Sequence, residues 1–213
     1  MAQSFEITSR QFKRAEEILT AAAATEPREL LAVKAMGPET LGHCQAFKVA
    51  DAAVQAQERA VTKEVTEAEA ASKSLRKKYD ETREVVMSKA PGQKFPAAVT
   101  LKTPDDLLLE CEDVEQVLDE RKTEGWASAL LEDFGPTLDA ATKEVTEATG
   151  ALAQLQKLKA ARQSVGLGAR PTFVSFRRVV RATFGRSSKE YRGLLDRRGA
   201  ATEDDTDEDV VTT

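Results

Sequence analysis

The sequence predicts an all-α protein, an elongated antiparallel helical bundle with long coiled-coil-like helices. Residues 39–89 contain no Pro and a single Gly, which suits one long uninterrupted helix. Aromatic residues make up only 5% of the chain, whereas Ala, Glu, Lys, Thr and Leu recur, so we expect a core of small and aliphatic side chains. No run of alternating β-branched residues between turn residues indicates a strand.

The first helix is expected between about Thr8 and Ala24, with Thr8 or Ser9 as its N-cap. Its apolar stripe has helical spacing and consists of Phe12, Ala15, Ile18, Leu19 and Ala22. Pro27 interrupts this pattern. A proline fits the first turn of a helix, so Pro27 is expected to open a short helix that ends at Gly37.

The longest helix is expected from Pro38 to Lys89, where apolar or small residues recur every seven positions in two registers. The first register is Phe47, Val54, Val61, Ala68, Leu75 and Thr82, and the second adds Val65, Ser72, Tyr79 and Val86. The separations of four and three are those of a coiled-coil seam. At 1.5 Å per residue this helix is about 75 Å long. Five seam residues are therefore candidates for an intermolecular face where the helix outruns its neighbours: Val54, Val61, Val65, Leu75 and Tyr79.

The segment Ala90-Pro91-Gly92 is expected to end the long helix, because Pro and Gly both disfavour its continuation. Residues 93–103 then read as a loop, with Phe95 as its apolar anchor.

The next helix is expected to begin with Thr103 as N-cap and Pro104 at the first position. Asp105 and Asp106 follow, near the positive end of the helix dipole. This helix is predicted to run to about Phe134, where the adjacent Gly135-Pro136 breaks or kinks it. The apolar pattern resumes over residues 137–165, and Gly166-Leu167-Gly168 is expected to stop it.

Two identical heptapeptides lie 80 residues apart: Thr62–Ala68 and Thr142–Ala148 both read TKEVTEA. A weaker resemblance, at an offset of 77, precedes each copy. One hypothesis is a duplicated helical hairpin, with units of about 27–103 and 104–170 that together close a four-helix bundle. The alternative is coincidence in a chain rich in these residues, which the 98-residue distance between the two Gly-Pro breaks favours.

The net charge of −5 is unevenly distributed along the chain. Residues 157–198 hold twelve basic and two acidic residues, residues 199–213 hold six acidic ones, and the first 156 residues carry −9. Such asymmetry indicates a charged interaction surface. The pattern predicts four parts: an N-terminal helical segment (1–37), a long-helix bundle (38–168), a basic aromatic helical arm (169–198) and an acidic disordered tail (199–213).

The basic arm carries the candidate partner-binding residues. Its apolar residues follow one another at spacings of three, four and four, which places them in one helical stripe flanked by arginines. Arg170-Pro171-Thr172 is a candidate helix start, and Gly185–Ser188 a candidate break. The predicted binding residues are Phe173, Phe176, Arg177, Arg178, Val180, Arg181, Phe184, Arg186, Tyr191 and Arg192.

Three interpretations of the arm remain open. The stripe packs on the bundle of its own chain and the arginines meet acidic faces there, or it docks into a neighbouring subunit or another protein. In the third, the arginines bind phosphates of nucleic acid or an anionic membrane surface. The acidic tail either folds back on the arginines, in competition with a polyanion, or only keeps the chain soluble.

No catalytic residue, metal site or cofactor is predicted. His43 is the only histidine, and its neighbour Cys44 points about 100° away from it on a helix. A carboxylate-bridged di-iron site needs two Glu-x-x-His motifs and is excluded. A zinc site from His43, Cys44 and Cys111 lacks a fourth ligand. The sequence contains no phosphate loop, dinucleotide fingerprint or nucleophile elbow.

We therefore expect a non-enzymatic structural or scaffold protein that self-associates or joins a larger complex through its long helices and arm. The alternative is a protein that binds nucleic acid or an anionic surface through residues 170–198. No stretch approaches about 18 consecutive apolar residues, so no membrane span is expected. The N-terminus lacks the pattern of a secretory signal, and two distant cysteines suit reduced thiols, so a cytoplasmic location is expected.

Overall fold

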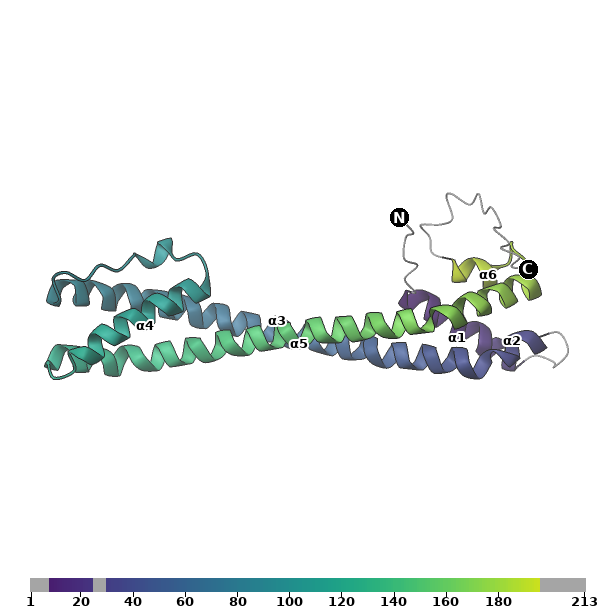
Figure 1. Ribbon diagram of the computed structural model, residues 1–213, viewed down its shortest axis with the longest axis horizontal. Helices are drawn as coiled ribbons and strands as arrows, with labels where there is room; N and C mark the ends of the chain where they lie inside the picture. Colours follow the sequence, from purple (N-terminus) through teal and green to yellow (C-terminus); the bar gives the residue numbers. More distant parts are fainter. Residues whose placement is uncertain (1–7, 25–29, 196–213) are drawn as a thin grey trace, which may run out of the picture. The chain divides into compact units, whose positions relative to one another are not determined.

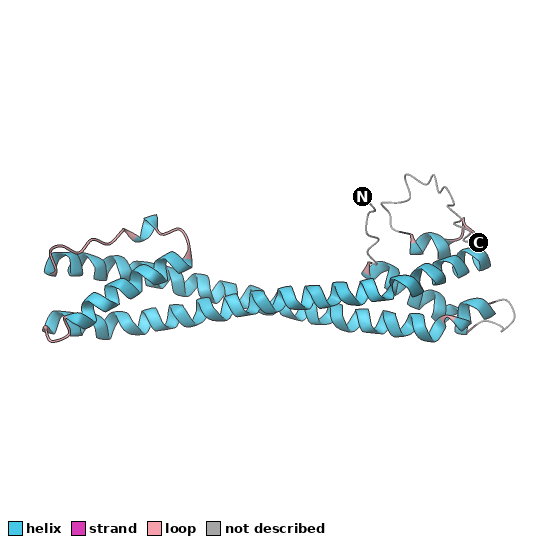
Figure 2. Cartoon of the chain, viewed as in Figure 1, coloured by secondary structure: helices cyan, strands magenta, loops and turns pink. Residues whose placement is uncertain are grey.

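The computed structural model describes residues 8–24 and 30–195, and every regular element among them is a helix (Figures 1 and 2). The all-α prediction is confirmed. The elements are α1 (Ser9–Ala23), α2 (Leu31–Ala35), α3 (Gly37–Lys89), the 3₁₀ turn η1 (Ala98–Thr100), α4 (Pro104–Glu120), α5 (Gly125–Phe184) and α6 (Lys189–Leu194). No helix of the described part is long and apolar enough to span a membrane. Pro27 and the acidic tail lie outside the described residues.

The chain forms two compact units, and the helices α3 and α5 continue from one into the other. The first unit combines the described residues up to Val54 with those from Leu158 onward, and the second is Gln55–Lys157.

Polar contacts between α3 and α5 show that the two helices run antiparallel in each unit. In the first unit the Thr172 hydroxyl donates to a Glu39 carboxylate oxygen at 2.6 Å, and Arg162 bonds Asp51 at 2.8 Å. In the second unit the Gln57 amide donates to the Ala151 carbonyl at 3.1 Å, and Lys78 pairs with Asp133. As the residue numbers rise along α3, the numbers of their partners on α5 fall.

The core of the first unit is unusually aromatic for this chain. Phe12 of α1 stacks on Phe47 of α3, with ring centroids 4.3 Å apart. Around this pair pack aliphatic residues of α1 and α2 and the buried face of α5 and α6. Residues from both ends of the chain therefore fill one core, which explains why α1 and the C-terminal helices fold together.

The core of the second unit is built by α3, α4 and α5. Its largest fully buried side chains are Tyr79, Phe134, Leu75, Leu107, Leu118 and Val86. The predicted anchor Phe95 is buried in this core. The loop around it is fixed to α3, because Arg76 donates to the carbonyls of Ala98 and Leu101 at 2.7 Å each, and the Tyr79 hydroxyl donates to the Pro96 carbonyl at 2.9 Å.

The predicted helix starts at Thr8 and Thr103 are present as capping boxes. The Thr8 hydroxyl accepts from the Gln11 N–H while the Gln11 side chain accepts from the Thr8 N–H. Thr103 and Asp106 make the same reciprocal pair, with Pro104 in the first turn. Each pair satisfies backbone N–H groups that a helix start otherwise leaves without a partner. The predicted ends at Lys89 and Phe184 agree with the structure, and Gly92 and Gly185 adopt positive φ just beyond them.

Three predicted interruptions of α5, one of them the break that was the alternative to a kink at Pro136, are wrong, because this helix continues from Gly125 to Phe184. It passes through Pro136, through the Gly166–Gly168 stop, and through the predicted helix start at Pro171. Both proline rings lie on exposed positions, so each costs a hydrogen bond without disturbing the core. Buried residues within two positions of each proline hold the helix in place, and tertiary packing outweighs the local preference. They are Phe134 and Leu138 around Pro136, and Ala169 and Thr172 around Pro171.

The predicted helix from Pro104 to Phe134 is also wrong, since α4 ends at Glu120 and α5 begins at Gly125. The predicted seam of α3 does form the buried stripe of that helix. The sequence predicted Val54, Leu75 and Tyr79 as part of an intermolecular face. That prediction is wrong, because these residues are at most 1% exposed within their own chain. Val61 and Val65 are only partly buried.

The two TKEVTEA heptapeptides lie in the second unit, one on α3 and one on α5. They occupy equivalent environments, since Ala68 is 8% and Ala148 is 7% exposed. Lys63 contacts Glu64 and Glu67 just as Lys143 contacts Glu144 and Glu147. The identical segments thus face each other across an antiparallel helix pair. The duplication stays a hypothesis, and the predicted units 27–103 and 104–170 differ from the two compact units.

Candidate interaction surfaces

The apolar half of the predicted binding residues lies in the core of the first unit. Phe173, Phe176, Val180 and Tyr191 are at most 4% exposed, and Phe184 packs partly buried against the same core. The Phe173 ring meets Phe12 edge-on at 5.0 Å and Phe176 at 6.3 Å. These side chains are therefore occupied by contacts within their own chain.

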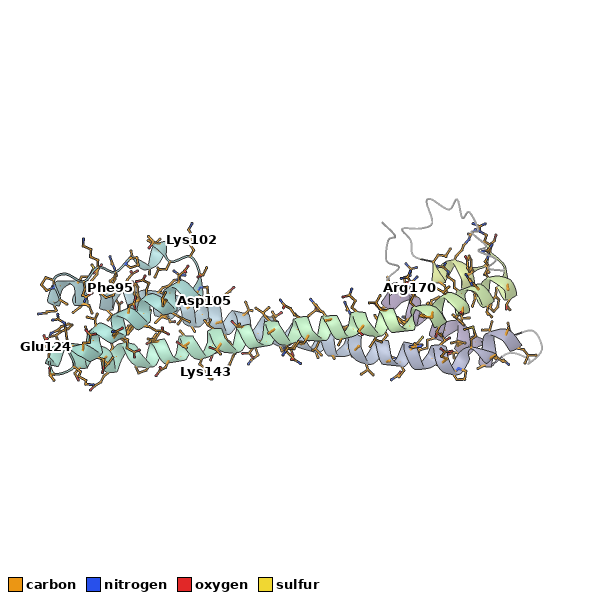
Figure 3. The ribbon with its side chains drawn as sticks, viewed as in Figure 1. Phe95, Lys102, Asp105, Glu124, Lys143 and Arg170 are labelled. Carbon is orange, nitrogen blue, oxygen red and sulfur yellow. The ribbon has the colours of Figure 1, made fainter. Side chains whose placement is uncertain are left out.

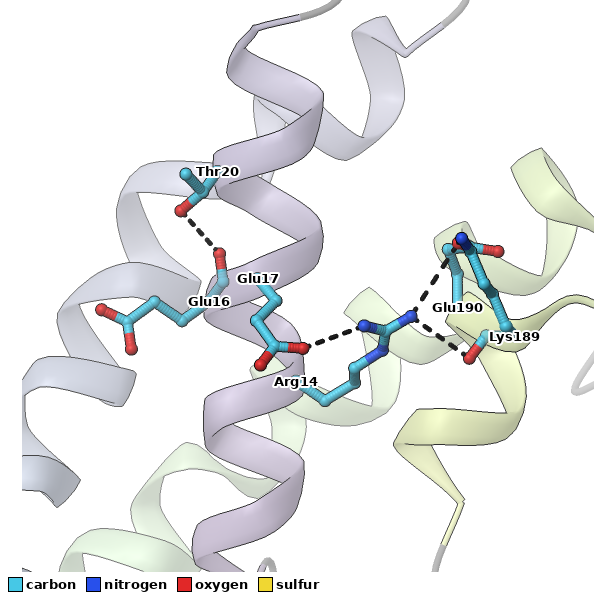
Figure 4. A network of polar contacts seen from close by, with 6 residues as sticks. All are labelled: Arg14, Glu16, Glu17, Thr20, Lys189 and Glu190. Atoms are coloured by element: carbon cyan, nitrogen blue, oxygen red, sulfur yellow. Dashed lines mark hydrogen bonds and ion pairs between the residues drawn. The ribbon is translucent and has the colours of Figure 1, made fainter.

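Polar contacts fix α6 on α1 (Figure 4). The guanidinium of Arg14 bonds a Glu17 carboxylate oxygen at 2.9 Å and the Lys189 carbonyl at 3.4 Å, and lies 3.8 Å from Glu190. The buried Gln11 amide donates to the Leu194 carbonyl at 2.9 Å. The C-terminal arm is thus bound to the N-terminal helix by aromatic packing and by hydrogen bonds.

The charged half of the predicted residues faces outward. Arg178, Arg181, Arg186 and Arg192 are exposed, and Arg177 is partly buried. Arg178 and Arg181 belong to a continuous surface of α5, which we call the arginine face: Leu167, Arg170, Val174, Arg178 and Arg181. At 3.6 residues per turn these five positions fall within about 80° of the helix circumference. Figure 3 shows Arg170 projecting from α5. The face also has two apolar positions, Leu167 at its start, which is 48% exposed, and the partly buried Val174 between Arg170 and Arg178.

A face of opposite charge lies on α4 of the second unit. The helix contains eight Asp and Glu and no Lys or Arg. Its exposed side, which we call the acidic face, consists of Asp105, Asp106, Leu109, Glu112, Asp113, Gln116, Asp119 and Glu120. Leu109 is 60% exposed in its centre.

The pKa values of two glutamates on α4 are raised by burial and, to a smaller extent, by neighbouring carboxylates. Burial raises the pKa of Glu110 first, and the negative charge of Asp113 raises it further. Burial also raises the pKa of Glu115, again with nearby carboxylates adding to the shift. Asp106 is the exception, since its hydrogen bond from the Thr103 hydroxyl lowers its pKa. Like charges this close favour a cationic counterpart.

An open groove of about 640 Å³ lies beside the start of α4. Its apolar lining comes from Val65 and Ala68 of α3 and from Val145, Ala148 and Leu152 of α5. Lys102 and Asp105, labelled in Figure 3, are among its charged residues. The lining mixes both signs of charge and so indicates no particular class of ligand.

The remaining groups of chemical interest among the described residues are a cluster of three glutamates and two buried thiols. Glu64, Glu144 and Glu147 have carboxylate oxygens within 4.8 Å of one another, but they are also contacted by the ammonium groups of Lys63 and Lys143. Burial raises the pKa of the Cys44 thiol to about 11 and that of the Cys111 thiol to about 12. The Cys44 thiol donates to the Phe12 carbonyl at 3.4 Å. A thiol with so high a pKa is a poor nucleophile at neutral pH.

Leu167 was not predicted as part of this face, because the predicted stop at Gly166–Gly168 separated it from the arginines. Val174 was passed over because it lies outside the aromatic stripe. Acidic residues were also treated as solvated surface, and α4 was passed over. The signal was present, since eight acidic residues without one basic residue in 17 positions is a strong local bias.

The comparisons with known proteins add no relative: neither a family model, nor a curated protein, nor a solved structure matches the chain.

Proposed function

We propose that this chain is a non-enzymatic interaction protein that binds an acidic protein surface through its arginine face. The observation that carries the proposal is the division of the arm: its aromatic residues fill the core of their own unit, and its arginines lie on one exposed helix face. A core that fixes α5 holds these cations at constant spacing, which reduces the entropy lost on binding.

A protein partner suits this face better than nucleic acid. Leu167 lies at the start of the arginine face and the partly buried Val174 lies between Arg170 and Arg178, and apolar positions favour a partner with its own apolar side chains. Proteins that bind single strands stack bases on exposed aromatic rings. In this arm Phe173, Phe176 and Tyr191 are at most 4% exposed. Two buried, free thiols suit a reducing compartment, so we place the protein in the cytosol.

Binding to nucleic acid is the second candidate, because arginines without an aromatic platform still bind phosphate groups. Among the described residues of the first unit, 14 are basic and 5 are acidic, which gives these residues a net charge of +9. Phosphate binding through three or four arginines predicts a log–log salt slope of about −3 to −4.

The test compares two labelled probes by fluorescence anisotropy: a synthetic helical peptide with Leu and Glu on one face, and a short double-stranded DNA. The wild-type chain is expected to bind the peptide more tightly at equal salt. Arg178→Glu/Arg181→Glu is expected to lose binding, whereas the matched control Lys89→Glu/Lys94→Glu, with exposed cations in the second unit, is expected to keep it.

A third variant, Leu167→Ser, separates the two candidates. It leaves the charge unchanged and removes an apolar side chain, so it is expected to weaken the peptide and spare the DNA. Tighter binding of DNA than of the peptide, with no effect of Leu167→Ser, would decide for the second candidate. Binding of neither probe would refute both.

A further inference from the structure

The two compact units carry net charges of opposite sign. Residues 55–157 hold 14 basic and 21 acidic residues, a net charge of −7, whereas residues 1–54 and 158–213 hold 17 basic and 15 acidic residues, a net charge of +2. Within that first unit the described residues alone carry +9. One chain thus contains both members of a complementary pair of surfaces, and complementary potentials favour and orient association.

The arginine face and the acidic face also match in extent and pattern. At 1.5 Å per residue, Leu167–Arg181 covers about 21 Å of α5 and Asp105–Glu120 about 22 Å of α4. On each face the positions recur at separations of about three and four, although not every position is charged. Each face also includes a leucine that is about half or more exposed, Leu167 at 48% and Leu109 at 60%.

Several charges on both faces are available for new ion pairs. Among the described residues, Arg170, Arg178 and Arg181 make no ion pair or side-chain hydrogen bond, and neither do Glu112 and Asp113. Charges that are already solvated and unpaired lose little on pairing with a partner, and two exposed leucines gain by mutual burial.

We propose that the acidic partner of the arginine face is the acidic face of α4 on a second copy of this chain. The inference rests on the proposed function and names its partner. Because the two faces are different surfaces, the contact is heterologous, and each copy keeps one free face after the first contact. Association is therefore expected either to close as a dimer in which the second pair of faces also meets, or to continue into rings or open filaments, and in each case to weaken with salt.

The test measures mass by sedimentation equilibrium on the full chain at about 20 mM and about 1 M salt, conditions that differ widely in screening. Wild type is expected to exceed the 23.2 kDa monomer at low salt and to return to it at high salt. Two charge-reversed variants are each expected to stay monomeric at low salt: Arg178→Glu/Arg181→Glu, which has two acidic faces, and Glu112→Lys/Asp113→Lys, which has two basic ones.

Mixing the two variants is the decisive step. The unchanged acidic face of the first variant fits the unchanged arginine face of the second, and the two reversed faces fit each other. An equimolar mixture is therefore expected to regain the mass of wild type at low salt. Glu84→Lys/Glu132→Lys, which reverses exposed acids outside α4, is the control and is expected to associate as wild type does. Circular dichroism confirms that each variant is folded.

The measured mass and the measured peptide binding together distinguish a failure of this inference from a failure of the proposed function. A wild-type chain that stays at 23.2 kDa in low salt and still binds the acidic peptide through Arg178 and Arg181 would overturn the inference and leave the proposed function standing. Association that survives both charge reversals would overturn the inference as well. Folded variants that stay monomeric when mixed would do the same, because the two faces would then not be each other's partners.

Discussion

Replacement of Phe173 by Ala tests whether the arm is part of its own unit's core. The ring is 1% exposed and makes edge contacts with Phe12 at 5.0 Å and Phe176 at 6.3 Å. Truncating a buried Phe to Ala costs about 3–5 kcal/mol, and two aromatic contacts place this site in the upper half of that range. We expect Phe173→Ala to lower the free energy of unfolding by about 4 kcal/mol.

Urea unfolding followed by far-UV circular dichroism measures this loss. Trp126 is the only tryptophan and lies in the second unit, so its fluorescence reports on that unit. We expect the mutation to shift the urea transition followed by this fluorescence less than the transition followed by circular dichroism. The matched control is Ser175→Ala, two residues along the same helix and exposed, with an expected change within about 0.5 kcal/mol. A loss below about 1 kcal/mol for Phe173→Ala, or an equal loss for Ser175→Ala, would refute the packing argument.

Three further predictions concern the interior and the helix breakers. The buried Thr40 hydroxyl has no hydrogen-bond partner among the described residues, so Thr40→Val is expected to raise the free energy of unfolding by about 1 kcal/mol, and a loss in urea unfolding would contradict this. Pro171→Ala restores an N–H inside α5 and is expected to add about 1–3 kcal/mol by the same measurement, while no gain would mean that the helix is broken there. Above pH 9 the unfolded chain loses thiol protons that folded Cys44 and Cys111 keep up to about pH 11 and 12, so the free energy of unfolding falls with rising pH. Cys44→Ala is expected to flatten that slope between pH 9 and 10.5, and an unchanged slope would count against a buried thiol.

The sequence predicted those parts of the fold that depend on local chemistry. The helix starts at Thr8 and Thr103 could be predicted because a threonine hydroxyl is a favourable N-cap. In the structure each threonine completes a capping box with the Gln or Asp three residues later. The buried stripe of α3 could be predicted from its apolar residues, which recur every seven positions, because the periodicity of a buried stripe follows from helix geometry alone.

The continuity of α5 could not be predicted from its sequence, because it depends on tertiary contacts. Pro136 and Pro171 are helix breakers in isolation, and here each lies on the exposed side between buried residues. For the same reason the arm's aromatic stripe gave no hint of its partner. A stripe that packs on its own chain and one that docks on another require the same spacing, and only Phe12 and Phe47 in the structure show which surface covers it.

Binding through the arginine face is tested most directly by the affinity of the Leu/Glu helical peptide for three chains at low salt: wild type, Arg178→Glu/Arg181→Glu and Lys89→Glu/Lys94→Glu. We expect Arg178→Glu/Arg181→Glu to bind at least about tenfold more weakly than wild type, since exposed ion pairs contribute up to about 1 kcal/mol each and reversal adds repulsion. We expect Lys89→Glu/Lys94→Glu, with the same change in net charge, to bind within about twofold of wild type. Equal losses in the two variants would contradict the account, because net charge rather than the arginine face would then govern binding.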